Sequence, residues 1–200
     1  MKRVLWLTVL ALALPLTAFA DSVDFTNSGG ILAGSTNGLS LTGSALIAVN
    51  NGSGLVTGTD LGSVSFSTGA LSGGSMQMGG TFAAGGSFTI TGNGSNGVPN
   101  GTIFAGTFSS PATWTLVTLA NGTHNYTLTG VVAGTLGSNF FTNGVTVQLT
   151  VNTGRGFFNG RTHISSGDTN VVVPEPGSLS LLGTGLLGLA GVIRRKLKVS

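Results

Sequence analysis

Val145-Thr146-Val147-Gln148-Leu149-Thr150-Val151 alternates an apolar residue with a polar one at every step. This period of two is that of a β-strand, whose successive side chains point to opposite faces of a sheet. One face of the segment is therefore expected to be buried, and the other to present hydroxyl and amide groups. The same alternation recurs in shorter runs at residues 39–42, 64–67, 88–91, 114–116 and 126–129.

Asn-Gly dipeptides separate many of these runs, and both residues tolerate the positive φ that tight hairpin turns require. Eight such pairs begin at Asn37, Asn51, Asn93, Asn96, Asn100, Asn121, Asn143 and Asn159. Residues 21–173 show no helical period, and a chain with 35 glycines opposes one. The sequence predicts an all-β domain, a single mostly antiparallel β-sandwich, with a β-solenoid as the alternative.

The alternation also predicts which side chains form the core, and aromatic residues in these positions are expected to pack rather than to bind a ligand. The core candidates are Val64, Phe66, Phe82, Phe88, Ile90, Phe104, Phe108, Trp114, Leu116, Tyr126, Leu128, Val145, Val147, Leu149 and Val151. Phe140-Phe141 and Phe157-Phe158 break the pattern, so one ring of each pair is expected to face outward.

The N-terminal residues have the three parts of a secretory signal peptide. Lys2 and Arg3 are basic, residues 4–14 are apolar, and Ala18-Phe19-Ala20 is a small-residue cleavage site before Asp21. Residues 1–20 are therefore predicted to be removed by signal peptidase, with Ala18 and Ala20 at the cleavage site.

An uncharged apolar run at residues 178–193 lies near the C-terminus and is followed by Arg194-Arg195-Lys196. As a helix the run would extend about 24 Å, somewhat less than the ~30 Å of a bilayer core. The basic residues predict a membrane stop on the cytoplasmic side. Before the run, Pro174 and Pro176 flank Glu175 and favour an extended chain.

Residues 172–198, with Pro174-Glu175-Pro176, a short apolar helix and a basic end, resemble a PEP-CTERM sorting domain. The resemblance implies export, transient retention in the inner membrane, and processing by an exosortase near a motif whose recognition residues are Pro174, Glu175 and Pro176. The chain is accordingly divided into a signal peptide (1–20), an exported β-domain (21–173) and a sorting signal (174–200). The expected final location is the cell surface or the extracellular space.

The charge balance of the exported domain argues against a nucleic-acid partner. Six of the eight basic residues lie in the two terminal segments, which accounts for the isoelectric point near 10. Residues 21–173 keep two arginines against four aspartates, a formal charge of −2 with no basic patch for phosphates. Cysteine is absent, so the domain has neither disulfides nor a thiol nucleophile.

Residue patterns typical of catalysis, metal binding or cofactor binding are missing, so none of these is predicted. His163 and Asp168 could be combined with a serine into a triad, but no Gly-x-Ser-x-Gly sequence is present. The aspartates are scattered, which disfavours a metal site. Residues 92–97 match Gly-x-Gly-x-x-Gly, yet Val98-Pro99 follows where a dinucleotide site needs a helix.

Two functions of different kinds remain. The first is a non-catalytic structural or adhesive component of the cell envelope or extracellular matrix, which self-associates or adheres to polysaccharide because its uncharged strand edges are unprotected. The second is a carbohydrate-binding or carbohydrate-active module, in which an exposed Phe or Trp would act with Arg161, His163 and Asp168.

Overall fold

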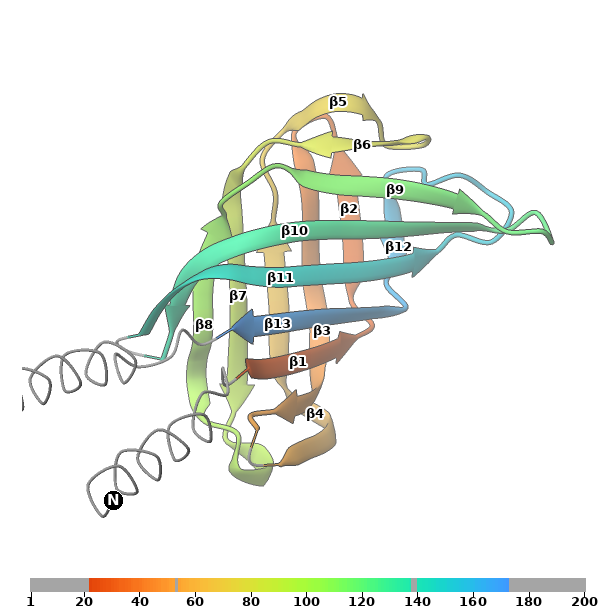
Figure 1. Ribbon diagram of the computed structural model, residues 1–200. Helices are drawn as coiled ribbons and strands as arrows, with labels where there is room; N and C mark the ends of the chain where they lie inside the picture. The colour runs from red at the N-terminus through yellow and green to blue at the C-terminus, as the bar shows by residue number, and fades with distance from the viewer. Residues whose placement is uncertain (1–21, 53, 138–139, 173–200) are drawn as a thin grey trace, which may run out of the picture. The chain divides into compact units, whose positions relative to one another are not determined.

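The computed structural model describes residues 22–52, 54–137 and 140–172, which form thirteen β-strands of one sheet (Figure 1). The strands are β1 Ser22–Ser28, β2 Ile31–Ser35, β3 Gly38–Asn50, β4 Leu55–Ser67, β5 Leu71–Ser75, β6 Gly79–Phe82, β7 Gly85–Asn93, β8 Asn100–Phe108, β9 Ala112–Thr118, β10 His124–Leu136, β11 Phe140–Asn152, β12 Arg161–His163 and β13 Ser166–Val172. Within these ranges no helix is long and apolar enough to cross a membrane. The predicted signal peptide and the helix predicted at 178–193 lie outside them.

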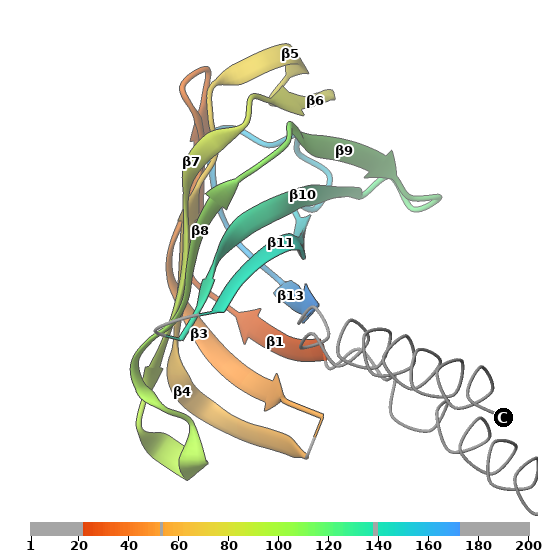
Figure 2. The same cartoon turned by 60° about the vertical axis from the view of Figure 1, so that its left-hand side comes forward.

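Eight of the strands close into a barrel. Neighbours follow the order β11-β13-β1-β3-β4-β7-β8-β10, and β10 also pairs with β11, which joins the two ends of the path. Each of these pairings is antiparallel. Figures 1 and 2 show two layers, in which β10, β11, β13 and β1 cross over β3, β4, β7 and β8.

The predicted all-β class is confirmed, but the predicted sandwich of separate sheets is wrong, and so is the solenoid alternative. Long strands pass from one layer into the other. One edge of β10 pairs with β9 over residues 124–129 and with β8 over residues 132–136. The matching edge of β3 pairs first with β2 and then with β1. Register shifts along β3, and between β10 and β11 where the extra residue lies in β11, favour this bending, because a bulge increases local twist and turns a strand through a corner.

The five remaining strands extend the barrel wall at these two corners. β9, β6 and β5 follow in order from the first half of β10, while β2 and β12 follow from the first half of β3. Three aromatic side chains, Trp114, Tyr126 and Phe158, attach this region to the loops. The Trp114 Nε1–H donates to the Met76 carbonyl at 2.9 Å, and the Tyr126 hydroxyl donates to the Gln77 carbonyl at 2.6 Å. The Phe158 amide donates to the Tyr126 hydroxyl at 3.1 Å.

The barrel interior is filled by phenylalanines from four wall strands and by aliphatic residues around them. Phe88 lies 6.1 Å from Phe66, 6.0 Å from Phe104 and 6.3 Å from Phe108, measured between ring centroids. Such pairs add to the stabilisation from burial. Every predicted core residue is buried except Leu116, which is partly buried. The predicted core omitted Phe25, Leu32, Leu46, Val132 and Val171, which are also fully buried, and it omitted Leu39 although that residue lies in an alternating run.

Most Asn-Gly pairs lie where strands turn, as expected. Asn37-Gly38 joins β2 to β3, and Asn121-Gly122 joins β9 to β10. The pairs at Asn93, Asn96 and Asn100 lie at or next to the β7–β8 connection: Asn93 ends β7, Asn96-Gly97 is in its 3-10 turn at Ser95–Gly97, and Asn100-Gly101 begins β8. Asn143-Gly144 is the exception. It lies inside β11, where Gly144 has φ +92 and the β10–β11 register shifts, so it forms a bulge instead of a hairpin turn.

Gly106 of β8 and Gly134 of β10 are paired directly opposite each other where the two layers meet. A Cβ added at Gly134 would collide with the backbone of Ala105 and Gly106. The close approach of these strands therefore depends on glycine, and the barrel corner has no room for a side chain there.

We expect Gly134→Ala to lower the free energy of unfolding by about 1–3 kcal/mol, because the added methyl group overpacks the corner. Urea denaturation of the exported domain measures this change. Gly73→Ala is the matched control: a Cβ at Gly73 meets nothing within 4 Å, and the expected change is within about 0.5 kcal/mol. Equal effects of the two substitutions would contradict the packing argument.

Candidate functional site

The predicted sorting and processing residues lie outside the described ranges. These are Ala18 and Ala20, Pro174, Glu175 and Pro176, and the basic residues Arg194, Arg195 and Lys196. What the structure describes is the part of the barrel that leads into the sorting segment, namely the end of β13. Val172 is the last described residue, and Pro174 follows two positions later.

Val172 is held in the sheet from both sides. It pairs with Ser22 of β1, and the preceding residue Val171 pairs with Val23 and is fully buried. The β11–β13 ladder ends earlier, at Thr146 opposite Asn170. Beyond that point the Thr142 hydroxyl of β11 donates to the Val172 carbonyl at 2.8 Å, and Thr142 is 1% exposed. At Val172, therefore, a hydrogen bond from the Thr142 side chain takes the place of the backbone pairing between β11 and β13, which has already ended.

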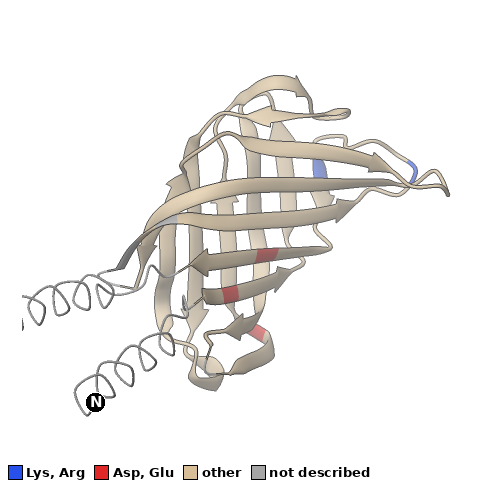
Figure 3. Cartoon of the chain, viewed as in Figure 1, with Lys and Arg blue, Asp and Glu red and all other residues tan. Residues whose placement is uncertain are grey.

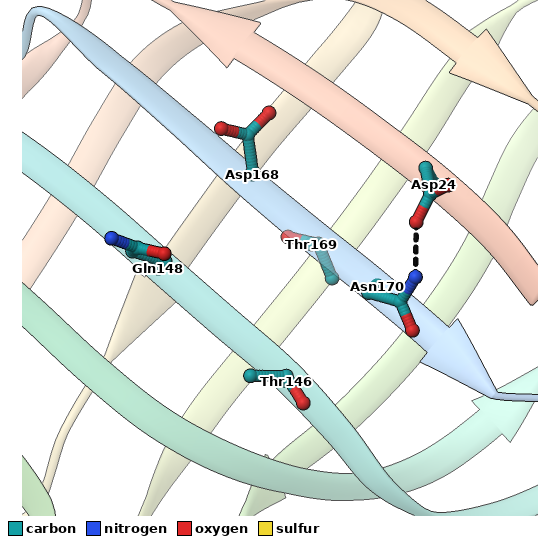
Figure 4. Close-up of a pocket in the computed structure, with 6 residues that line it drawn as sticks. All are labelled: Asp24, Thr146, Gln148, Asp168, Thr169 and Asn170. Carbon is teal, nitrogen blue, oxygen red and sulfur yellow. Dashed lines mark hydrogen bonds between the residues drawn. The ribbon is translucent and has the colours of Figure 1, made fainter.

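The second feature is a polar depression of about 230 Å³ on the outer face of β11, β13 and β1 (Figure 4). Its lining is Asp24, Thr146, Gln148, Asp168, Thr169 and Asn170. The register explains the grouping, because Asp168 lies opposite Gln148 and Asn170 lies opposite both Thr146 and Asp24. The Asn170 amide donates to the Asp24 carboxylate.

The depression combines carboxylate, amide and hydroxyl groups from three neighbouring strands, which can accept and donate hydrogen bonds. Asp24 and Asp168 carry two of the few charges of the barrel and lie on the adjacent strands β1 and β13, and acidic positions on these strands are red in Figure 3. Within the described ranges no group of three or more His, Cys, Asp and Glu side chains could hold a metal ion. The sequence could not reveal this grouping, since Asp24 and Asp168 lie at opposite ends of the domain.

The residues proposed from sequence for carbohydrate chemistry are not assembled into one site. His163 of β12 is hydrogen-bonded through Nδ1 to the Gly30 carbonyl at 3.0 Å, whereas Asp168 of β13 faces the polar depression. Arg161 lies on β12, which pairs with β2 rather than with β13 (Figure 3). Among the side chains that the structure describes, no hydrogen bond or ion pair joins these three.

The other histidine and the exposed phenylalanine form a separate contact. His124 is 8% exposed, shares a hydrogen bond of 3.1 Å with the Thr118 hydroxyl, and stacks on Phe157 with 4.4 Å between ring centroids. Phe157 is 47% exposed while Phe158 is buried, which confirms that one ring of this pair faces outward. The side chains of Phe140 and Phe141 lie outside the described part. Trp114 is buried, so it cannot serve as an exposed sugar platform.

A third feature is an apolar pocket of about 310 Å³ at the end of the barrel where β1 begins. Val23, Val49, Ile103 and Leu136 line it together with Phe25, Pro99 and neighbouring polar residues. These residues come from four strands, β1, β3, β8 and β10, and from the loop before β8. They are far apart in sequence, and none of them was among the core residues predicted from alternation.

The hairpin of β5 and β6 forms an outer edge of the sheet. β5 pairs with β6 alone among the described strands, apart from the Leu71 amide, which donates to the Thr36 carbonyl. Residues 71–82 carry no charge. Met78, in the turn of the hairpin, is 67% exposed. This uncharged edge with an exposed apolar tip lacks the charged residues that usually prevent edge-to-edge pairing.

The match to a known family concerns the chain's C-terminal segment. No curated protein matches the chain, and neither does any solved structure. Residues 172–196 match the family model of the PEP-CTERM protein-sorting motif, which therefore begins at the last residue of β13. The order of Pro-Glu-Pro, apolar run and basic residues is the feature that predicted this result. The chain is thus a protein that carries a PEP-CTERM sorting motif.

Proposed function

We propose that this is an exported protein which an exosortase sorts to the cell envelope or extracellular matrix, where the β-barrel acts as a non-catalytic structural or adhesive unit. The PEP-CTERM motif at residues 172–196 carries the first half of the proposal. The second half is supported by the barrel itself. Its titratable side chains are dispersed over β1, β4, β10, β12 and β13 and its loops. Within the part described, the His124 imidazole shares a hydrogen bond with the Thr118 hydroxyl, but no carboxylate is hydrogen-bonded to either side chain to complete a triad.

The outer surface of the barrel supports a structural role. Positions that face away from the core are mostly Ser, Thr, Asn and Gly, and charged residues are few and widely spaced (Figure 3). Hydroxyl and amide groups bind polysaccharide hydroxyls without charge. The β5–β6 hairpin offers an uncharged edge to a second copy, although its short length predicts weak association.

A carbohydrate-binding module is the second candidate, and the polar depression favours it. Asp168, Gln148 and Thr146 project from adjacent strands beside a volume of about 230 Å³, which is enough for part of a sugar chain. In this version of the function Asp168 and Asp24 are the binding residues, and His163 and Arg161 are not.

The sorting proposal predicts a shortened mature protein. Intact mass spectrometry of protein isolated from the native envelope is expected to find a chain that begins at Asp21 and ends near Glu175. Glu175→Ala should leave the C-terminal segment attached in most molecules, because the enzyme loses a recognition group. Asp60→Ala removes the same charge from an exposed site on the barrel and should be processed normally. Full processing of Glu175→Ala would contradict the assigned role.

The structural proposal predicts concentration-dependent self-association through the β5 edge. Gly73→Lys places a charge on that edge without a steric clash, and is expected to weaken association about tenfold. Thr115→Lys adds the same charge at an exposed position of β9, an internal strand, and should have little effect. Sedimentation equilibrium measures both. A wild-type domain that stays monomeric at high concentration and is not retained by envelope polysaccharide would contradict this function.

The carbohydrate proposal predicts that Asp168→Ala and His163→Ala differ in their effect on polysaccharide binding. Asp168→Ala should weaken retention of the domain on native envelope polysaccharide about tenfold or more, because a hydrogen bond to a charged group is lost. His163→Ala should leave retention unchanged, since His163 lies on β12 outside the depression. Affinity electrophoresis in gels that contain the polysaccharide provides the measurement. Unchanged retention of Asp168→Ala would exclude the depression as the binding site.

A further inference from the structure

The sorting motif begins without a spacer after the folded barrel. β13 continues to Val172, and the residues that match the PEP-CTERM motif also begin at Val172. Only Val173 separates this strand from Pro174. An enzyme that recognises Pro174-Glu175-Pro176 therefore works within two residues of a closed β-barrel.

The last residues of β13 are engaged by the barrel in three ways. Val171 is fully buried in the core, Val172 pairs with Ser22, and the buried Thr142 hydroxyl donates to the Val172 carbonyl at 2.8 Å. The backbone ladder with β11 stops at Asn170, so the Thr142 hydroxyl is the contact that β11 makes with the strand's final residue. The strand end is thus fixed by a side chain at a place where backbone pairing to β11 has ceased.

Enzymes that bind peptides in clefts commonly take them as extended strands and use backbone hydrogen bonds. Pro174 and Pro176 have no backbone N–H, so the motif itself offers few donors. The nearest residues before Pro174 that could supply backbone contacts are Val173, Val172 and Val171. Two of these three, Val171 and Val172, already pair with β1 in the barrel.

We propose that the barrel controls the processing of its own sorting motif: Val171 and Val172 must leave the sheet before the enzyme can bind, and the Thr142 hydroxyl is the latch that holds them. This inference rests on the proposed sorting by an exosortase. Strand ends open locally far more often than a whole domain unfolds, so the open form is reached without loss of the barrel.

Loss of the latch has a calculable consequence. Without the Thr142 hydroxyl the Val172 carbonyl loses its partner from β11, and the open form of the strand end gains population by a factor of about 5 to 30. When opening precedes cleavage and is rare, the rate of processing rises by the same factor.

The experiment follows the full-length chain in its native host by pulse labelling, and measures the rate at which the C-terminal segment is removed. Thr142→Val keeps the size of the side chain and removes the hydroxyl, and we expect processing to be at least fivefold faster. A Gly-Ser-Gly-Ser insertion between Val173 and Pro174 supplies free backbone and should accelerate processing similarly. The insertion leaves the barrel sequence intact, so it tests the inference even where Thr142→Val is degraded. Thr142→Val combined with the insertion should be no faster than the insertion alone.

Two matched controls separate the latch from general destabilisation. Thr68→Val removes another buried hydroxyl, which accepts from the Leu39 amide and donates to the Gly69 carbonyl, at a site away from β13. The same insertion after Gly122 lengthens the β9–β10 turn. Both controls should be processed at the wild-type rate. An unchanged rate for Thr142→Val and for the insertion at 173 overturns the latch, as does equal acceleration by Thr68→Val. A wild-type chain that is never shortened refutes the sorting proposal together with the latch.

Discussion

The antiparallel ladder between β1 and β13 joins the first described strand to the last, with Ser22 opposite Val172 and Asn27 opposite Gly167. This pairing places two strands separated by most of the chain side by side, and the barrel closes only when it forms. Chain entropy opposes such a long-range contact. The domain has no cysteine to hold it with a disulfide, so backbone hydrogen bonds and the phenylalanine-rich core must supply the stabilisation. Closure also leaves few free strand edges. Because charged residues usually protect free edges from pairing with other chains, a barrel with few edges needs little surface charge.

The same ladder determines what surrounds the candidate sites. Asp24 and Asp168 become neighbours because β1 and β13 pair, and Gln148 joins them because β13 also pairs with β11. The end of the ladder is the point at which the sorting motif leaves the barrel, and Thr142 completes the hydrogen bonding there. The proposed binding surface and the proposed control of processing therefore depend on one structural feature. A change that opens the β1–β13 pairing would alter both.

Much of the architecture follows from local rules. Alternation identified the strands of the central segment and nearly all the predicted core, because burial of one face of a sheet imposes a period of two. Asn-Gly marked the turns at Asn37 and Asn121, where the glycines Gly38 and Gly122 adopt the positive φ that other residues rarely accept. The same dipeptide at Asn143 is a bulge inside β11, and nothing local distinguishes the two uses. Leu116 is only partly buried, whereas Ala112 and Trp114 of the same strand β9 are buried, so burial is lost toward the end of that strand.

The sequence by itself determined that the chain is β-structured, that its ends resemble export and sorting signals, and that its middle is nearly neutral, since these properties depend on residue type and short-range spacing. Only the tertiary structure decided that the sheet closes into a barrel, because the pairing of β1 with β13 and the exchange of partners along β3 and β10 leave no local trace. It also separated His163 from Asp168 and brought Asp24 to Asp168. The physical reason is that alternation specifies which face of a strand is buried, whereas the neighbour of each strand is selected by the packing of the whole core.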